Sequence, residues 1–151
     1  MVLENTFSNH LTNPIPTVTI ARFYISQYTK KMTQYLIYHN PRCRKSRESL
    51  QVLEEANLNF QVKLYLEEGL DTEEVEKLKE SLGLDVLKFM RTKEPEFKAM
   101  GLSKETADNQ LIQALTATPK LLERPIIVSS DSRAVIGRPV DQTKKFLGLA
   151  D

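Results

Sequence analysis

Two apolar segments that flank one helical segment constrain this chain most, because together they require a pair of parallel strands. Residues 34–39 (QYLIYH) form a short run of aromatic and branched side chains, which is typical of a buried strand. Residues 60–66 (FQVKLYL) alternate in polarity, as a second strand does. Between them, Leu50 and Leu53 recur at helical spacing, which predicts a helix over about residues 43–57. A strand, a helix and a strand in this order form a right-handed parallel crossover, so we expect an α/β fold.

The rest of the chain adds helices first and a hairpin last. Asp71 stands three residues before Glu74, as a capping residue does, and Gly83 ends that helix. The pattern then predicts, in order, a helical turn over 85–90, a helix over 108–119 capped by Asp108, strands over 125–128 and 133–136, and a final helix over 140–147. The turn between the two late strands makes them an antiparallel hairpin. We therefore expect a mixed sheet covered by helices, with a helical insertion over about residues 71–118.

Residues 1–33 differ from the rest of the chain, and we expect them to be an extension outside the core domain of residues 34–148. They are rich in Asn, Thr and Ser and carry Pro14 and Pro16. They lack the unbroken apolar stretch of a secretory signal and the many arginines of a mitochondrial transit peptide. Met32 directly precedes the first strand, so a shorter product that starts at Met32 is one interpretation.

Composition excludes several classes of function. The 151 residues carry 21 Lys and Arg against 20 Asp and Glu, a net charge of +1, which argues against a dedicated nucleic-acid binder. No run approaches the ~18 apolar residues of a membrane span. The single cysteine cannot form an intramolecular disulfide, which suits a reducing compartment such as the cytoplasm. One cysteine with His10 and His39 makes no metal site, and five glycines make no glycine-rich nucleotide loop.

That cysteine, Cys43, follows a predicted strand and opens a predicted helix. The N-terminal end of a helix carries free N–H groups and a partial positive charge, both of which stabilise a thiolate and bind anions. Cations lower the pKa of a thiol further, and four of them flank Cys43: Arg42, Arg44, Lys45 and Arg47. The segment therefore indicates a nucleophile inside an anion-binding cradle. The alternative is a buried, inert cysteine beside a solvated basic run.

Two neighbours of Cys43 are candidates for tuning its reactivity. Ser46 stands where a dithiol oxidoreductase carries its second cysteine, and its hydroxyl can donate a hydrogen bond to a thiolate. A hydroxyl cannot resolve a disulfide, so a resolving thiol must come from another molecule. His39 titrates near neutral pH and is a candidate for orienting the site. The alternatives are an ordinary first-turn serine and a partly exposed, inert histidine.

Three arginines further along the chain suit an oxyanion substrate. Arginine binds tetrahedral oxyanions through two parallel hydrogen bonds. Arg124 and Arg138 each precede a proline at the two ends of the late hairpin, and Arg91 lies in the insertion. From spacing alone, each of the three can equally be a surface arginine.

The residues from His39 to Cys43 (HNPRC), followed by Ser46 and Arg47, resemble the active site of the glutaredoxin-dependent arsenate reductases. Further blocks in the same order are similar to that family: residues 64–67 (LYLE), 90–91 (MR), 124–128 (RPIIV) and 137–139 (GRP). The resemblance covers about residues 34–147.

The resemblance implies a thioredoxin-like fold with a helical insertion, in which Arg124 and Pro125 occupy the position of a cis-proline. It makes Cys43 the nucleophile. The oxyanion-binding arginines are Arg91, Arg124 and Arg138, and the residues that tune the thiolate are His39, Ser46 and Arg47. The thiolate attacks arsenate, glutathione attacks the adduct as a co-substrate, and glutaredoxin takes over the mixed disulfide. No bound cofactor or metal is implied.

Two other functions stay open at this point. The chain can be an oxidoreductase of glutathione mixed disulfides, for which arsenate is incidental. It can also be a redox-related adaptor or regulator that uses the fold as a docking surface. Since the chain lacks a second cysteine, a dithiol switch is excluded for that adaptor.

Overall fold

The computed structural model describes residues 34–149. The N-terminal extension predicted for residues 1–33, and with it the interpretation of Met32, lies outside the described residues. Among the described residues, no helix is both long enough and apolar enough to cross a membrane.

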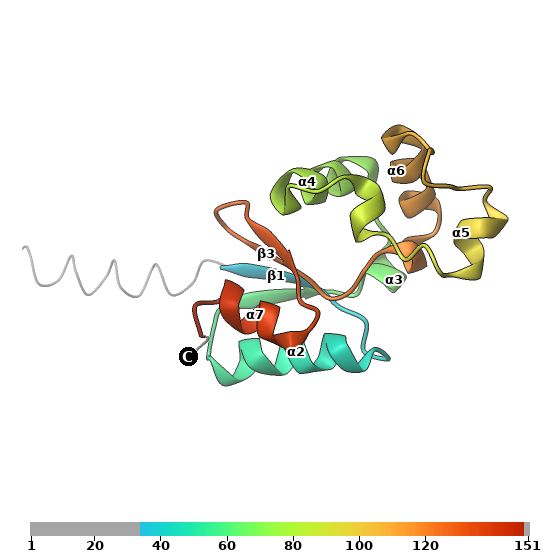
Figure 1. Ribbon diagram of the computed structural model, residues 1–151. Coiled ribbons are helices and arrows are strands. Elements are labelled where there is room, and N and C mark those ends of the chain that lie inside the picture. Colours follow the sequence, from blue (N-terminus) through green and yellow to red (C-terminus); the bar gives the residue numbers. More distant parts are fainter. Residues whose placement is uncertain (1–33, 150–151) are drawn as a thin grey trace, which may run out of the picture. The chain divides into compact units, whose positions relative to one another are not determined.

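A mixed sheet of four strands forms the centre of the fold (Figure 1). Its strands lie in the order β2-β1-β3-β4, and their bounds are β1 Tyr35–Tyr38, β2 Phe60–Lys63, β3 Ile126–Ser129 and β4 Ala134–Ile136. The β1 and β2 strands are parallel, whereas β3 runs antiparallel to both β1 and β4. The predicted parallel pair, the late hairpin and the mixed sheet are all confirmed.

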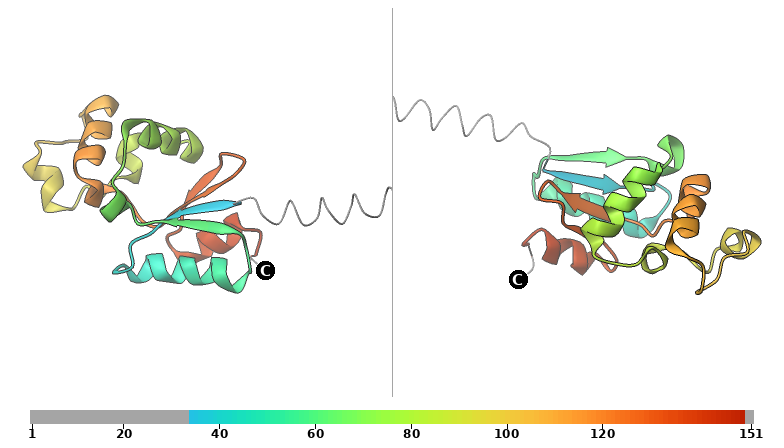
Figure 2. Two further views of the ribbon diagram at one scale, coloured as in Figure 1. Left: turned by 180° about the vertical axis from the view of Figure 1, so that it is seen from behind. Right: turned by 90° about the horizontal axis from the view of Figure 1, so that it is seen from above.

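One face of the sheet is covered by two helices, α2 (Arg44–Glu55) and α7 (Val140–Phe146), which pack against each other (Figures 1 and 2). Strand side chains alternate between the two faces. Ile37 and Ile127 therefore point to this side, where they form a small core with Leu53 of α2.

The other face carries the larger core, and α4 (Thr72–Leu82) lies across it. Between β2 and β3 the chain forms helices and turns and adds no strand to the sheet. Besides α4 they are α3 Tyr65–Glu68, the 3-10 helix η1 Val86–Phe89, α5 Pro95–Ala99, α6 Asp108–Ala117 and the 3-10 helix η2 Pro119–Leu121. Side chains from these elements, such as Phe89 and Leu115, are fully buried against Ile126 of the sheet face.

Three local predictions are corrected by the structure. The second strand ends at Lys63 rather than residue 66, because the chain turns into α3, where the ring of Tyr65 is buried. Asp108 does not cap α6: it is the first helical residue, and its carboxylate pairs with Lys79. The sequence analysis also missed α5, a helix too short to show a periodic pattern.

Candidate active site

Cys43 lies at the carboxyl end of β1, directly before the first residue of α2. A tight turn brings it there: the N–H of Cys43 donates to the carbonyl of Asn40 (2.9 Å), and the Asn40 side-chain oxygen accepts from the N–H of Arg42 (2.9 Å). Asparagine favours turns because its side chain can bond the backbone two residues later. The turn places the thiol at the N-terminal end of a twelve-residue helix, as the sequence predicted.

The predicted tuning residues hold this turn in place. The hydroxyl of Ser46 accepts from the N–H of Asn40 (3.0 Å) and lies 2.9 Å from Nδ1 of His39. All three residues are buried, and His39 is only 5% exposed, so the reading of a partly exposed histidine is wrong. The hydrogen bonds found for the Ser46 hydroxyl therefore go to the turn and the histidine rather than to the sulfur. Burial is the main reason that the pKa of His39 is lowered, which favours the neutral ring.

The electrostatics of Cys43 favour a thiolate. Burial raises the pKa of the thiol, but the backbone N–H groups of Ser46 and Lys45 and the guanidinium of Arg124 outweigh it. The pKa of Cys43 is consequently lower than its ordinary value. Ser46 thus acts on the sulfur through its backbone.

The basic run around Cys43 contributes less than its sequence suggests. Arg44 and Lys45 both pair with Glu48, one turn along α2, at 2.8 and 2.9 Å. The side chain of Arg44 is 83% exposed, so this pair lies in solvent. Arg47 donates to the carbonyl of Pro41 (2.8 Å) and so braces the turn. The predicted contribution of the flanking cations is therefore limited for Arg44 and Lys45, because the carboxylate of Glu48 one turn away pairs with both.

The hairpin brings two of the predicted arginines to the sulfur. Arg124 immediately precedes Pro125 at the start of β3, and Arg138 follows β4. The Nη2 atom of Arg138 lies 4.0 Å from the Cys43 sulfur, and Arg124 acts on the thiol as described above. The Arg124–Pro125 peptide bond is cis, which confirms the expectation, and the Arg138–Pro139 bond is cis as well.

Gly137 allows the segment before Arg138 to lie this close to the helices. Its carbonyl accepts from the hydroxyl of Ser49 (3.1 Å), which also lies 2.8 Å from the hydroxyl of Thr143. A Cβ atom at this position would stand 2.5 Å from the Thr143 oxygen and 2.9 Å from that of Ser49. A side chain at position 137 would therefore push Arg138 away from the thiol.

Arg91 joins the same region through a short backbone pairing. Met90 forms an isolated antiparallel bridge with Leu122, and the N–H of Arg91 donates to the carbonyl of Leu121 (2.7 Å). This pairing fixes Arg91 beside the segment that leads into Arg124. Its guanidinium is ion-paired with Glu94.

Two residues at the site were missed by the sequence analysis. Glu123 lies 3.5 Å from Nη1 of Arg138. Tyr65 begins α3 at the same end of the sheet as Cys43, since β2 runs parallel to β1. Its side chain is fully buried, and its hydroxyl has no hydrogen-bond partner among the described residues. Tyr65 belongs to the LYLE block, but no spacing rule assigns it a role.

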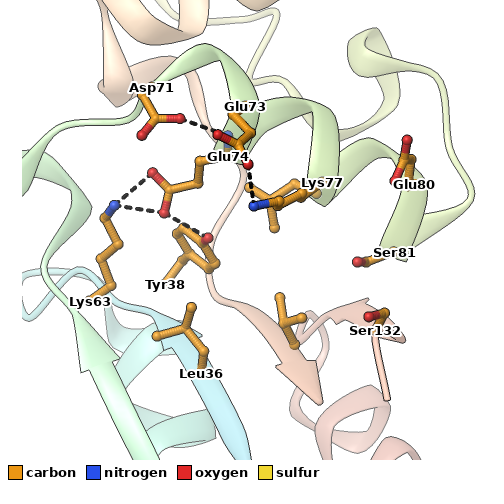
Figure 3. Close-up of a pocket in the computed structure, with 12 residues that line it drawn as sticks. Leu36, Tyr38, Lys63, Asp71, Glu73, Glu74, Lys77, Glu80, Ser81 and Ser132 are labelled. Atoms are coloured by element: carbon orange, nitrogen blue, oxygen red, sulfur yellow. Dashed lines mark hydrogen bonds and ion pairs between the residues drawn. The ribbon is translucent and has the colours of Figure 1, made fainter. Parts of the chain in front are cut away.

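A cavity of about 790 Å³ opens elsewhere, between α4 and the sheet (Figure 3). Two ion pairs lie on its wall: Lys63 contacts both carboxylate oxygens of Glu74 at 2.6 Å, and Lys77 contacts Glu73 at 2.6 Å. The wall also carries the carboxylates of Asp71 and Glu80. Cys43 does not line this cavity. Within residues 34–149, no three His, Cys, Asp or Glu side chains gather as ligands of a metal ion.

Comparison with known proteins identifies similar chains that share nearly their whole length with this one. The model of the ArsC family matches residues 38–146. The uncharacterized protein YfgD of Escherichia coli (strain K12) is 42% identical over 117 residues, which are 76% of this chain and 98% of that protein. An arsenate reductase of Haemophilus influenzae is 36% identical over 114 residues, which are 74% of this chain and 97% of that protein.

A solved structure with a similar fold is that of an arsenate reductase from Vibrio cholerae. It is 39% identical and has a TM-score of 0.70, over 78% of this chain and 99% of that one. The likeness confirms the thioredoxin-like arrangement expected for the mixed sheet and its helices.

Proposed function

The chain belongs to the ArsC family, and on that premise we propose that it reduces arsenate to arsenite through an adduct on Cys43. The observation that carries the proposal is the surroundings of the one cysteine. The same groups that lower the pKa of Cys43, namely first-turn N–H groups and Arg124, are donors suited to an oxyanion.

In the first step, the thiolate of Cys43 attacks the arsenic atom of dihydrogen arsenate. The sulfur–arsenic bond forms while one oxygen leaves with a proton from solvent as water, so arsenic stays pentavalent. Arg91, Arg124 and Arg138 bind the remaining oxygens and offset their charge. His39, Ser46 and Arg47 hold the turn so that the sulfur faces the anion.

The two electrons for the reduction must come from outside the chain, because the sequence holds one cysteine. Glutathione attacks the arsenic of the adduct, forms a second sulfur–arsenic bond and expels another oxygen as water. The thiol of glutaredoxin then attacks the glutathione sulfur and breaks its bond to arsenic. These two thiols become one mixed disulfide, arsenic takes up the electron pair, and water releases arsenite from Cys43. A reducing compartment such as the cytoplasm supplies both thiols.

The test is consumption of NADPH in a coupled assay with arsenate, glutathione, glutaredoxin and glutathione reductase. We expect oxidation that depends on arsenate in the wild type and is lost in Cys43→Ser, which keeps the shape but removes the nucleophile. Replacing glutathione and glutaredoxin by thioredoxin and its reductase should abolish turnover.

Turnover in Cys43→Ser would contradict the proposal. Equal rates with the thioredoxin system would contradict the proposed reductant but leave the nucleophile in place. A Cys43 that alkylates rapidly without any arsenate turnover would instead favour glutathione mixed disulfides as the substrate.

A further inference from the structure

The hydroxyl of Tyr65 is a buried polar group without a protein partner. The whole side chain is 0% exposed, and the oxygen has no hydrogen-bond partner among residues 34–149. Burying a hydroxyl without a hydrogen bond costs roughly 1–3 kcal/mol in proteins. Phenylalanine would fill the same space in the core without that cost, so the oxygen requires an explanation outside the packing.

The position of Tyr65 points to the active site. The residue follows the end of β2, and α3 packs against η2, the segment that leads into Arg124. Apart from burial, the groups that act most strongly on the hydroxyl are Arg124, Arg91 and Cys43. These are the nucleophile and two of the proposed oxyanion ligands.

One of these groups carries a second unpartnered donor. The Nε–H of Arg124 is also buried and without a hydrogen-bond partner among the described residues. Arg124 also acts on the Cys43 sulfur, so one ligand with several acceptor oxygens bound at that sulfur can satisfy both buried donors. A tetrahedral oxyanion has four oxygens and fits this requirement.

We propose that the Tyr65 hydroxyl donates a hydrogen bond to an oxygen of the bound oxyanion, next to the oxygen held by Arg124. This assignment rests on the proposed function and adds a neutral donor to its three arginines. Burial raises the pKa of Tyr65, so the hydroxyl keeps its proton at neutral pH and stays a donor.

Protection of Cys43 from iodoacetamide by inorganic phosphate and by arsenate tests the assignment without any turnover. An oxyanion in the site shields the thiolate, so the alkylation rate against anion concentration gives a dissociation constant. We expect Tyr65→Phe to raise that constant roughly tenfold, the size of one hydrogen bond to a charged ligand.

Tyr38→Phe is the matched control, because it removes another buried tyrosine hydroxyl that is bonded to Glu74 (2.8 Å) and belongs to a residue lining the cavity that Cys43 does not line. It should leave protection unchanged and lower the melting temperature. Tyr65→Phe should leave the melting temperature unchanged or raise it, since no protein hydrogen bond is lost.

Each other outcome overturns the assignment. Equal protection in the wild type and in Tyr65→Phe excludes Tyr65 from the oxyanion site but leaves the proposed function intact. A fall in melting temperature as large as that of Tyr38→Phe gives the hydroxyl a structural role instead. Absence of protection in the wild type removes the oxyanion site itself, and with it both proposals.

Discussion

At the scale of single residues, the reactivity of Cys43 depends on groups that are distant in the sequence. Burial raises the pKa of the thiol. Of the cations beside it, Arg44 and Lys45 pair with Glu48, and Arg47 donates to the carbonyl of Pro41. The first turn of α2 and Arg124 lower the pKa of Cys43. Arg124 lies 81 positions further along the chain, and the fold of the hairpin places it near the sulfur. The thiolate is therefore a product of the tertiary fold.

The two arginines nearest the sulfur should act on it unequally. Arg124→Gln removes the charge that lowers the pKa of Cys43, so the midpoint of alkylation by iodoacetamide should rise toward the value of a free thiol, about 8.5. Arg138→Gln should move it less, because that guanidinium is 4.0 Å from the sulfur and 41% exposed. Rate profiles from pH 5 to 10 measure both. A larger shift in Arg138→Gln would contradict the assignment.

The position of the candidate nucleophile was predictable from the sequence, whereas the details of its environment were not. A cysteine between a strand and a helix is a local pattern, and the order of the motif blocks located the arginines. The pairing of Arg44 with Glu48 is also local, at a spacing of four residues, and was overlooked. The unpartnered hydroxyl of Tyr65 is different, because the absence of a partner becomes visible only once the core around it is formed.

At the scale of elements, helix ends show which local signals decide structure. Asp71 accepts from the N–H of Glu74 (2.8 Å), and Gly83 takes the left-handed conformation that ends α4, both as predicted. Asp108 carries the same type of side chain but sits one residue too late to cap α6. The prediction failed there because helix boundaries read from a sequence vary by one or two residues.

These two aspartates make a matched pair for mutation. Asp71→Ala should lower the free energy of unfolding by about 1 kcal/mol, since it leaves a helix N–H without its cap. Asp108→Ala should cost less, because it removes a half-exposed ion pair with Lys79. Urea denaturation compares them, and the alkylation rate of Cys43 serves as the control that the site is intact. Equal losses of unfolding free energy in the two variants would contradict a stabilising contribution of the cap hydrogen bond at Asp71.

The misassigned end of the second strand also has a physical cause. Residues 60–66 alternate in polarity, which favours a strand, but the carboxylate of Glu68 reaches back to the N–H of Leu64 (2.6 Å) and starts α3. The turn places Tyr65 in the core instead of along an edge strand. The alternating polarity of residues 60–66 could not reveal this turn, because the side chains that bury Tyr65 come from the distant insertion.

At the scale of the whole molecule, one partly buried network ties α4 to the sheet. The hydroxyl of Tyr38 in β1 donates to Glu74 of α4 (2.8 Å), and Lys63 at the end of β2 contacts the same carboxylate at 2.6 Å (Figure 3). Burial and the hydrogen bond to Glu74 both raise the pKa of Tyr38. The contact between α4 and the sheet thus depends on the protonated hydroxyl of Tyr38.

Alkaline pH should therefore destabilise the protein through its buried tyrosines. Above pH ~10 the tyrosines of an unfolded chain lose their protons, whereas the folded protein keeps those of Tyr38 and Tyr65. The unfolded state then binds fewer protons than the folded state, so the free energy of unfolding falls as pH rises, by up to about 1.4 kcal/mol per pH unit for each group. Urea denaturation from pH 8 to 11 measures this slope. Tyr38→Phe should weaken the protein at pH 8 but make the slope of the unfolding free energy against pH shallower, by the contribution of up to one proton. Parallel curves for the variant and the wild type would exclude Tyr38 as a source of the stability lost at alkaline pH.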